Sequence, residues 1–232
     1  TPDTTLGDLV TLHPDLARHL EKRGLDYCCG GGRTLAEACT ALGLDPETTA
    51  LELAAVSSAP PEPWSDLGPA ELADHVEATH HAYLHEELPR LGELAAKVHA
   101  VHGDRHPELA EVLETFVALR ADLEPHLLKE ERMLFPAIRL LATAEEVPSF
   151  PFGTVQNPIS VMMSEHDQAG ELLATLRRTT GDYQAPADGC ASYQALYGGL
   201  EALEADTHLH VHKENNRLFP AVVALEATLG DR

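Results

Sequence analysis

Residues 126–138, HLLKEERMLFPAI, recur 84 residues later as residues 210–222, HVHKENNRLFPAV. Seven of the 13 aligned positions are identical, which indicates an internal duplication. Both copies begin with His and carry Glu at the fifth position. Because residues four apart lie on one face of an α-helix, the His and the Glu of each copy share a face.

The apolar residues before each copy decide which face the pair occupies. In the first copy, two apolar rows with heptad spacing run into His126 and Glu130 and continue to Met133 beyond the pair. The rows that lead to this pair are Leu109, Val112, Phe116, Leu119 and Leu123. The rows that lead to the second pair, His210 and Glu214, are Leu196, Leu200, Leu203 and Thr207. Both pairs are therefore predicted to be buried.

Two further helical segments each place one His on an apolar stripe. His81 shares a stripe with Leu84 and Leu88, and His166 lies on a stripe that begins at Met162. The sequence thus predicts four imidazoles and two carboxylates in one core. Buried carboxylates are costly unless they are paired or bind a cation. One His-x-x-x-Glu pair is typical of a solvated helix surface, but two matched copies in an apolar seam favour a metal site.

The predicted metal ligands are His81, His126, Glu130, His166, His210 and Glu214. Nitrogen and oxygen ligands without thiolates suit Fe, Mn or Zn, and such a set in a helical bundle is typical of carboxylate-bridged centres with two metals. Six side chains leave positions open on two metals, which oxygen species or small molecules can occupy. The residues alone leave the choice among the three metals open.

The rest of the chain predicts an all-α protein of two parts. Four long segments have helical periodicity and no competing strand pattern, which predicts a four-helix bundle. They lie at about 69–101, 107–141, 158–180 and 188–228. Shorter helical signals at 15–22, 35–42 and 46–56 predict a small helical domain at residues 1–57. Proline-rich residues 58–69 predict a linker before a bundle domain at residues 70–232.

Acidic residues dominate the charge of the chain. The 38 Asp and Glu against 16 Lys and Arg give a net charge of −22 over 232 residues. That charge disfavours nucleic acid and anionic membrane surfaces as partners. The longest nearly apolar run, residues 218–225, is too short to span a bilayer, and residues 1–12 lack the pattern of a signal peptide. We therefore expect a cytoplasmic protein.

The chain has 14 histidines, and His is the commonest metal ligand. Register with Leu84 and Leu88 is all that favours His81 over its neighbour as a ligand. Most of the histidines off the apolar stripes are expected at the surface: His80, His85, His99, His102, His106, His208 and His212.

Cys28 and Cys29 are adjacent and are followed by glycines. Adjacent cysteines do not form a relaxed disulfide, so free thiols are expected. They are candidate thiol or redox groups that could bind iron or exchange with a partner, and the glycines would let that partner approach closely. The alternative is that both sulfur atoms pack in a small core. Cys39 and Cys190 are expected to be buried small hydrophobic residues.

Together these motifs resemble two known domains. The segments containing His81, His126-x-x-x-Glu130, Ser-Glu-His166-Asp and His210-x-x-x-Glu214-Asn-Asn resemble the hemerythrin-like domain. The motif DYCCGG at residues 26–31 resembles the small N-terminal domain of the RIC family, which repairs iron centres. The resemblance implies an up-and-down four-helix bundle with a non-haem di-iron centre. In that centre the two Glu residues would bridge the irons alongside an oxo or hydroxo group.

The resemblance also implies a role in the repair of iron-sulfur clusters damaged by oxidative or nitrosative stress, by supplying iron. Oxygen-carrying hemerythrins use one more His ligand, which is not apparent in this sequence, and this favours the repair family. Asp122 and Glu165 occupy places where the family carries acids near an iron exit path. The alternative for both is a solvated or locally paired carboxylate.

Three functions stay open at this point. The first is a labile di-iron centre that donates iron to damaged iron-sulfur proteins, with the thiol domain helping to dock. The second is a di-iron oxidoreductase that reduces nitric oxide or peroxide, with the thiols as the entry point for electrons. The third is a sensor or carrier that binds dioxygen or nitric oxide. Damaged iron-sulfur proteins and small diatomic ligands or peroxide are the expected partners, and the two-part layout allows a homodimer.

Overall fold

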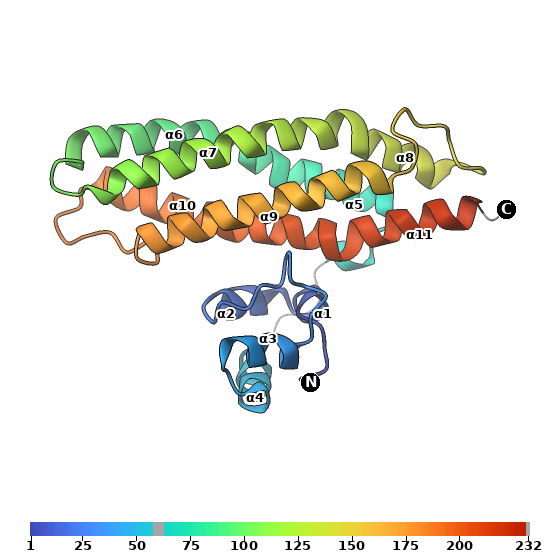
Figure 1. Cartoon of the computed structure of the whole chain (residues 1–232), viewed down its shortest axis with the longest axis horizontal. Coiled ribbons are helices and arrows are strands. Elements are labelled where there is room, and N and C mark those ends of the chain that lie inside the picture. Colours follow the sequence, from blue (N-terminus) through green and yellow to red (C-terminus); the bar gives the residue numbers. More distant parts are fainter. Residues whose placement is uncertain (58–62, 231–232) are drawn as a thin grey trace.

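The computed structural model describes residues 1–57 and 63–230, where isolated bridges are the only extended pairing. The prediction of an all-α protein is confirmed. Four short helices form the N-terminal part, and they lie beside the long helices of the bundle (Figure 1). They are α1 (Leu6–Leu12), α2 (Ala17–Glu21), α3 (Leu35–Leu42) and α4 (Pro46–Val56), with a 3₁₀ turn (Pro14–Leu16) before α2.

Side-chain caps start α1, α3 and α4. Thr34 and Glu37 form a reciprocal capping box at α3, and Asp45 accepts from the backbone N–H of Thr48 at α4. Helix α1 was not predicted from the sequence. Thr5 caps it by accepting from the N–H of Asp8, and its apolar residues pack into the N-terminal core.

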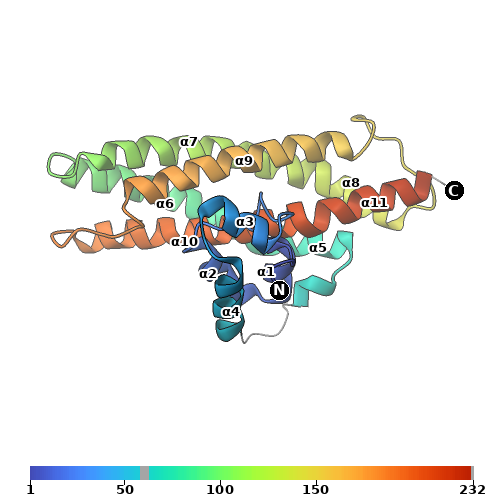
Figure 2. The same cartoon turned by 60° about the horizontal axis from the view of Figure 1, so that its bottom comes forward.

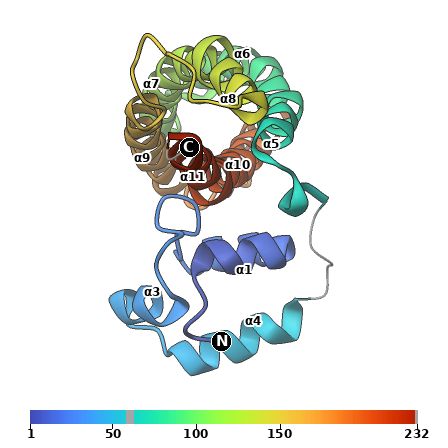
Figure 3. The same ribbon diagram turned by 90° about the vertical axis from the view of Figure 1, so that its right-hand side faces the viewer.

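The remaining helices form the bundle. They are α5 (Pro69–Val76), α6 (Ala82–His102), α7 (Glu108–Lys129), α8 (Phe135–Thr143), α9 (Gln156–Thr179), α10 (Ala191–Lys213) and α11 (Phe219–Gly230). Helices α6, α7, α9 and α10 pack around a ring in chain order, as the end-on view in Figure 3 shows. The prediction of an up-and-down four-helix bundle is confirmed. Among the described residues, no helix is long and apolar enough to cross a membrane.

Three of the four bundle helices contain a π-helical segment at the level of the predicted ligands. These segments are Glu77–His81, Glu130–Leu134 and Glu214–Leu218. Because a π turn holds one extra residue, the apolar register advances by one position after it. Leu134 is therefore buried, whereas Met133 is 41% exposed. The prediction that Met133 continues the buried seam was wrong for this reason.

The predicted ligands lie between two hydrophobic clusters of the bundle. One cluster contains Leu84 and Phe116, and the other contains Phe135 and Val222. A third cluster forms the core of the N-terminal part and also includes Val211 of α10. The N-terminal helices therefore pack on α10, beside which they lie in Figures 1 and 2.

The proline-rich stretch is only partly described, because residues 58–62 of the predicted linker lie outside the described ranges. Its second part forms a 3₁₀ helix, Pro63–Asp66, in which Trp64 is buried against the bundle. The indole ring of Trp64 lies 5.1 Å from Nζ of Lys213. This end of the predicted linker is thus fixed to the bundle.

Candidate metal centre

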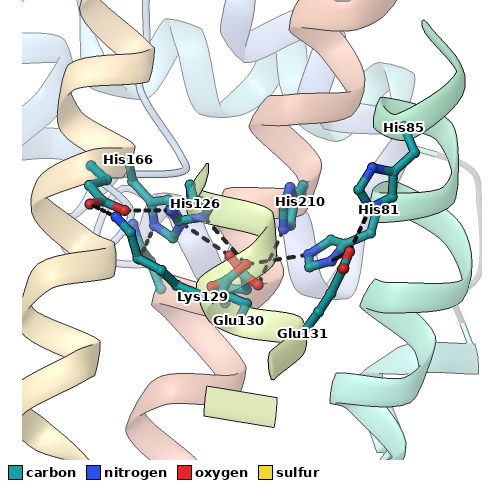
Figure 4. A network of polar contacts seen from close by, with 11 residues as sticks. His81, His85, His126, Lys129, Glu130, Glu131, His166 and His210 are labelled. Atoms are coloured by element: carbon teal, nitrogen blue, oxygen red, sulfur yellow. Dashed lines mark hydrogen bonds and ion pairs between the residues drawn. The ribbon is translucent and has the colours of Figure 1, made fainter. Parts of the chain in front are cut away.

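All six predicted ligands meet in the middle of the bundle, and all are buried. They come from four chain segments: the π segment before α6, the α7–α8 helix, α9, and the α10–α11 helix (Figure 4). In each of two groups of four residues, one ligand atom per residue lies within 4.8 Å of all the others. The groups are His81, Glu130, His210 and Glu214, and His126, Glu130, His166 and Glu214. Both carboxylates therefore belong to both groups.

The Nε2 atom of every ligand His faces a carboxylate oxygen. Oε2 of Glu130 lies 3.3 Å from Nε2 of His81 and 3.3 Å from Nε2 of His126. Oε2 of Glu214 lies 3.1 Å from Nε2 of His166, and Oε1 of Glu214 lies 3.2 Å from Nε2 of His210. The two copies of the repeat thus contribute equivalent halves of one centre.

The donor atoms fit a pair of cations better than they fit one another. The carboxylate oxygens of Glu130 and Glu214 are buried and have no aligned hydrogen-bond partner among the described residues. The Nε2 atoms of His126 and His166 lie 3.2 Å apart, although each is an acceptor when its ring is neutral and protonated at Nδ1. Buried polar atoms that converge in this way are typical of a site that binds an ion. The fold and these donors indicate a metal site.

Protonation of the metal-free site differs from one His to the next. Burial opposes a charge on His126, but the nearby carboxylate of Glu130 and the hydrogen bond to Glu165 outweigh burial and raise the pKa of His126 to about 10. Burial is the main effect at His210 and lowers its pKa to about 4 despite the nearby Glu214. Metal must therefore displace a proton at His126, whereas His210 is already neutral.

Three ligand histidines have an acceptor at their outer nitrogen, Nδ1. His81 pairs with Glu131 at 3.1 Å, His126 with Glu165 at 3.0 Å, and His166 with Asn215 at 2.9 Å. Carboxylate and amide oxygens only accept, so Nδ1 carries a hydrogen, and in the neutral ring the lone pair of Nε2 points into the centre. Such outer partners fix the tautomer that binds metal.

The two acids predicted to lie near an iron path, Asp122 and Glu165, differ in their contacts. Glu165 contacts His126 and forms an ion pair with Lys129. The hydrogen bond to His126 is the largest cause that lowers the pKa of Glu165, to about 2. Asp122 is partly buried and accepts from Nε2 of Gln168 at 2.8 Å. Of these two acids, only Glu165 therefore forms a hydrogen bond with a predicted ligand among the described residues.

The prediction of surface histidines was wrong at three positions. His80, His102 and His212 are buried. The other four are exposed, at His85, or partly buried, at His99, His106 and His208. The helical stripe showed only which residues face the bundle core. It did not show that other parts of the chain cover His80 and His212.

Cys28 is buried and Cys29 is partly buried, and neither belongs to the metal groups. Asp26 accepts from the backbone N–H of both cysteines through Oδ1 and from that of Gly30 through Oδ2. The hydrogen bond with Cys29 and burial raise the pKa of the Cys28 thiol well above its ordinary value. Cys28 is therefore a neutral thiol near pH 7.

The glycines of the cysteine loop have a role that the sequence did not indicate. A side chain at Gly31 would collide with Asn216 and with the carbonyl of Tyr27. The close approach expected of a partner protein is thus made by the chain's own α10–α11 helix. Of the other two cysteines, Cys39 is buried as expected, but Cys190 is exposed at the N-terminus of α10.

The fold and the site define a class of protein, which comparison with known families identifies. The Hemerythrin HHE cation binding domain matches residues 72–222. A second family, ScdA_N, described as a domain of unknown function (DUF542), matches residues 2–57. The bundle is therefore a hemerythrin-like cation-binding domain.

Relatives match over nearly the whole chain. The chain is 37% identical over 226 residues to the iron-sulfur cluster repair protein YtfE of Cronobacter sakazakii, covering 97% of this chain and 98% of that protein. It is 38% identical, with the same coverage, to the proteins of that name from Escherichia coli O157:H7 and Shigella boydii. The chain belongs to the family of these iron-sulfur cluster repair proteins. The resemblance found in the sequence is confirmed.

Proposed function

We propose that the protein holds two non-haem iron ions and donates iron to damaged iron-sulfur clusters. The observation that carries this proposal is the pair of overlapping ligand groups that share Glu130 and Glu214. The name of the relatives supports cluster repair as the purpose of the site. When bound, the two irons would supply transferable metal, with the two carboxylates and an oxo or hydroxo group as bridges.

The chain's own residues prepare the site for cations. Phe135 stacks on His81 with ring centroids 5.3 Å apart, and Phe219 stacks on His166 at 6.0 Å. These two Phe residues occupy equivalent positions of the repeat, and they restrict the rings from both halves. The hydrophobic clusters on either side exclude water, which strengthens the attraction between the carboxylates and a cation.

The cysteine loop supports docking better than electron entry. Cys28 is buried and neutral, and thiolates rather than thiols are the reactive form. Cys28 and Cys29 border a groove that Asp167, Arg178 and His208 of the bundle also line. We propose that a damaged iron-sulfur protein docks beside this groove. Reduction of nitric oxide or peroxide, and sensing of diatomic gases, stay predictions.

The proposal includes the organisation and setting of the chain. Residues 1–57 would form the docking domain and residues 70–232 the iron-binding domain, with residues 58–69 between them. Glu165 would guide leaving iron past His126, and Asp122 would lie further along that path. The cytoplasm is the proposed location, and a homodimer is a proposed assembly.

Metal analysis of protein purified from iron-replete cells tests the iron centre. We expect about two irons per chain, and a loss of both in a variant with Glu130→Leu and Glu214→Leu. Glu171→Gln, at an exposed carboxylate of α9, is the matched control and should keep both. Zinc at both positions would overturn the proposal. So would a loaded protein that cannot restore the cluster of an iron-depleted iron-sulfur protein.

A further inference from the structure

Cys190 differs from the other three cysteines of the chain in its exposure and its place. Cys28 and Cys39 are buried and Cys29 is partly buried, and all three belong to the N-terminal core or pack against it. Cys190 is exposed at the start of α10. It lies at the end of the bundle that holds the α6–α7 and α9–α10 connections, away from the N-terminal part (Figure 1). Binding and donation of iron give this thiol no role.

A buried imidazole faces the sulfur atom of Cys190. Nε2 of His102, in the last turn of α6, lies 3.1 Å from Sγ. His102 is 5% exposed, and its other ring nitrogen, Nδ1, is buried without a hydrogen-bond partner among the described residues. A buried nitrogen without a partner costs stability, and a redox or catalytic role is one of the reasons why such a group persists.

Tyr193 holds the imidazole of His102 in this place. The two rings meet edge to face, with centroids 5.5 Å apart and 73° between their planes. Tyr193 is fully buried, and its hydroxyl contacts that of Tyr197 at 3.2 Å and Oε1 of Glu108 at 3.3 Å. Because closely packed rings cannot turn without disturbing their neighbours, Nε2 of His102 stays directed at Sγ. The core of the bundle therefore keeps the imidazole against the thiol.

The start of α10 favours the thiolate form of Cys190. Cys190 is the N-cap residue of this 23-residue helix, where free backbone N–H groups stabilise an anion. The backbone N–H of Tyr193 is the largest cause that lowers the pKa of the Cys190 thiol from its ordinary value, and the charge of Lys97 on α6 also lowers it. A thiolate is the nucleophilic form of cysteine.

Asp188 is the acidic residue nearest to Cys190 in the chain, two positions before it. Its carboxylate lies 3.2 Å from Nε2 of His106 and 3.6 Å from the guanidinium of Arg105. Among the described residues, no carboxylate forms a hydrogen bond with Sγ of Cys190, whose hydrogen-bond partner is His102. The sulfur atom thus lies next to groups that stabilise a thiolate.

The other cysteines are too far away to form a disulfide with Cys190. They belong to the N-terminal part, whose core includes Val211 of α10. At a rise of 1.5 Å per residue, Val211 lies about 30 Å along the helix from Cys190. The Cβ atoms of a disulfide are only about 4 Å apart. A disulfide at Cys190 therefore needs a sulfur atom from another molecule.

We propose that Cys190 is a modification site that forms a mixed disulfide with a small disulfide compound, with His102 as the proton carrier. The thiol passes its proton to Nε2 of His102, and the thiolate attacks one sulfur of the compound. A bond forms between Sγ and that sulfur, the original S–S bond breaks, and the departing thiolate takes the proton from His102. Cys190 is oxidised and the departing sulfur is reduced, so no other oxidant is needed. This proposal does not depend on iron donation.

Reaction of the full-length chain with oxidised glutathione tests the proposal. The chain is sampled with time at pH 7, with and without iron, and mass spectrometry measures the glutathione adduct on the peptide that contains Cys190. We expect the adduct to form about tenfold faster in the folded chain than in the chain unfolded in urea. The unfolded chain keeps an accessible thiol, but it loses the contact with His102 and the helix N-terminus.

Three variants identify the groups that activate the thiol. His102→Gln removes the proton carrier, so adduct formation should slow about tenfold at pH 7, and its dependence on pH should move to higher pH. A purely structural role of His102 would not move that dependence. Lys97→Met should slow the reaction less, because Lys97 acts only through its charge. His99→Gln, three residues before His102 on α6, is the matched control and should keep the rate.

The outcomes separate this inference from the proposed function. An equal rate in the folded and unfolded chains would overturn the inference, and so would a rate that His102→Gln leaves unchanged. A disulfide-linked dimer in place of the glutathione adduct would also overturn it. If His102→Gln fails to fold by circular dichroism, the comparison of the folded and unfolded chains decides the question. A chain that forms the adduct but cannot donate iron would overturn the proposed function alone.

Discussion

Asn216 donates from Nδ2 to the backbone carbonyl of Cys28 over 2.9 Å, two residues after the predicted metal ligand Glu214. The residue between them, Asn215, faces Nδ1 of His166. Three consecutive side chains thus reach the metal centre, the outer nitrogen of a ligand, and the cysteine loop. The π-helical segment that holds them joins the two parts of the chain.

Replacing Asn216 by Ala should loosen the cysteine loop and leave the metal centre intact. The carbonyls of Cys28 and Tyr27 lose a donor, which should lower the free energy of unfolding by about 1 to 3 kcal/mol. Alkylation of Cys28 by iodoacetamide, followed by mass spectrometry, should become faster. Asn215→Ala is the control and should weaken iron binding without changing alkylation. Equal alkylation in both variants would contradict the role of Asn216 in holding the cysteine loop.

Glu165 and Asp122 should differ in their effect on iron affinity. Glu165→Leu removes the acceptor of His126, which should weaken iron binding about 10- to 100-fold. Asp122→Leu should leave the affinity unchanged, because the Asp122 carboxylate accepts from Gln168 and forms no hydrogen bond or ion pair with a predicted ligand among the described residues. Competition with a chelator of known affinity measures both. An equal loss in the two variants would show that Asp122 acts on the centre by a route outside its present contacts.

The N-terminal part should lose stability in alkali. The hydrogen bond with Cys29, then burial and the charge of Asp26, raise the pKa of Cys28 well above its ordinary value of 9.0. The folded state therefore favours the neutral thiol. Its contribution is complete below the pKa of the unfolded chain and is lost as the pH rises above it. We expect the free energy of unfolding to fall as the pH rises above about 9.

Denaturant unfolding in the presence of a reductant measures this fall. Cys28→Ala should flatten it, and Tyr27 should account for part of the remainder, because burial and Glu21 raise the pKa of its phenol too. Cys190→Ala, at an exposed thiol outside the N-terminal part, is the control and should keep the slope. A slope that Cys28→Ala leaves unchanged would show that this thiol does not govern it.

The ion pair of Arg177 and Glu204 should respond asymmetrically to substitution. Two contacts, of 2.6 and 3.2 Å, join the guanidinium to a carboxylate whose side chain is 3% exposed. Arg177→Met leaves that buried charge without its main partner, at a cost of about 3 to 5 kcal/mol. Glu204→Met replaces the charge with an apolar group and should cost less. Equal losses in denaturant unfolding would mean that Glu204 is better hydrated than its burial indicates.

The sequence by itself determined the bundle and its six central residues. Helical periodicity decides which residues share a face, and the repeat places His126 and His210 on the same face in both halves. A regular heptad pattern does not reveal a π segment, and for that reason it wrongly predicts Met133 in the buried seam. The buried residues His126 and Leu134 are eight positions apart instead of seven, and this longer spacing is the sequence signal of the π segment Glu130–Leu134.

Only the tertiary structure decided what surrounds those six residues. His212 faces away from the bundle core, yet it is buried because Thr11 and Tyr27 of the N-terminal part contact its ring. His80 is covered in the same way by Lys213. Burial at such positions depends on which distant segment packs there, and periodicity within one helix carries no information about that. Helical periodicity therefore predicts which side chains point into the centre, and packing between segments decides which groups contact their outer nitrogens.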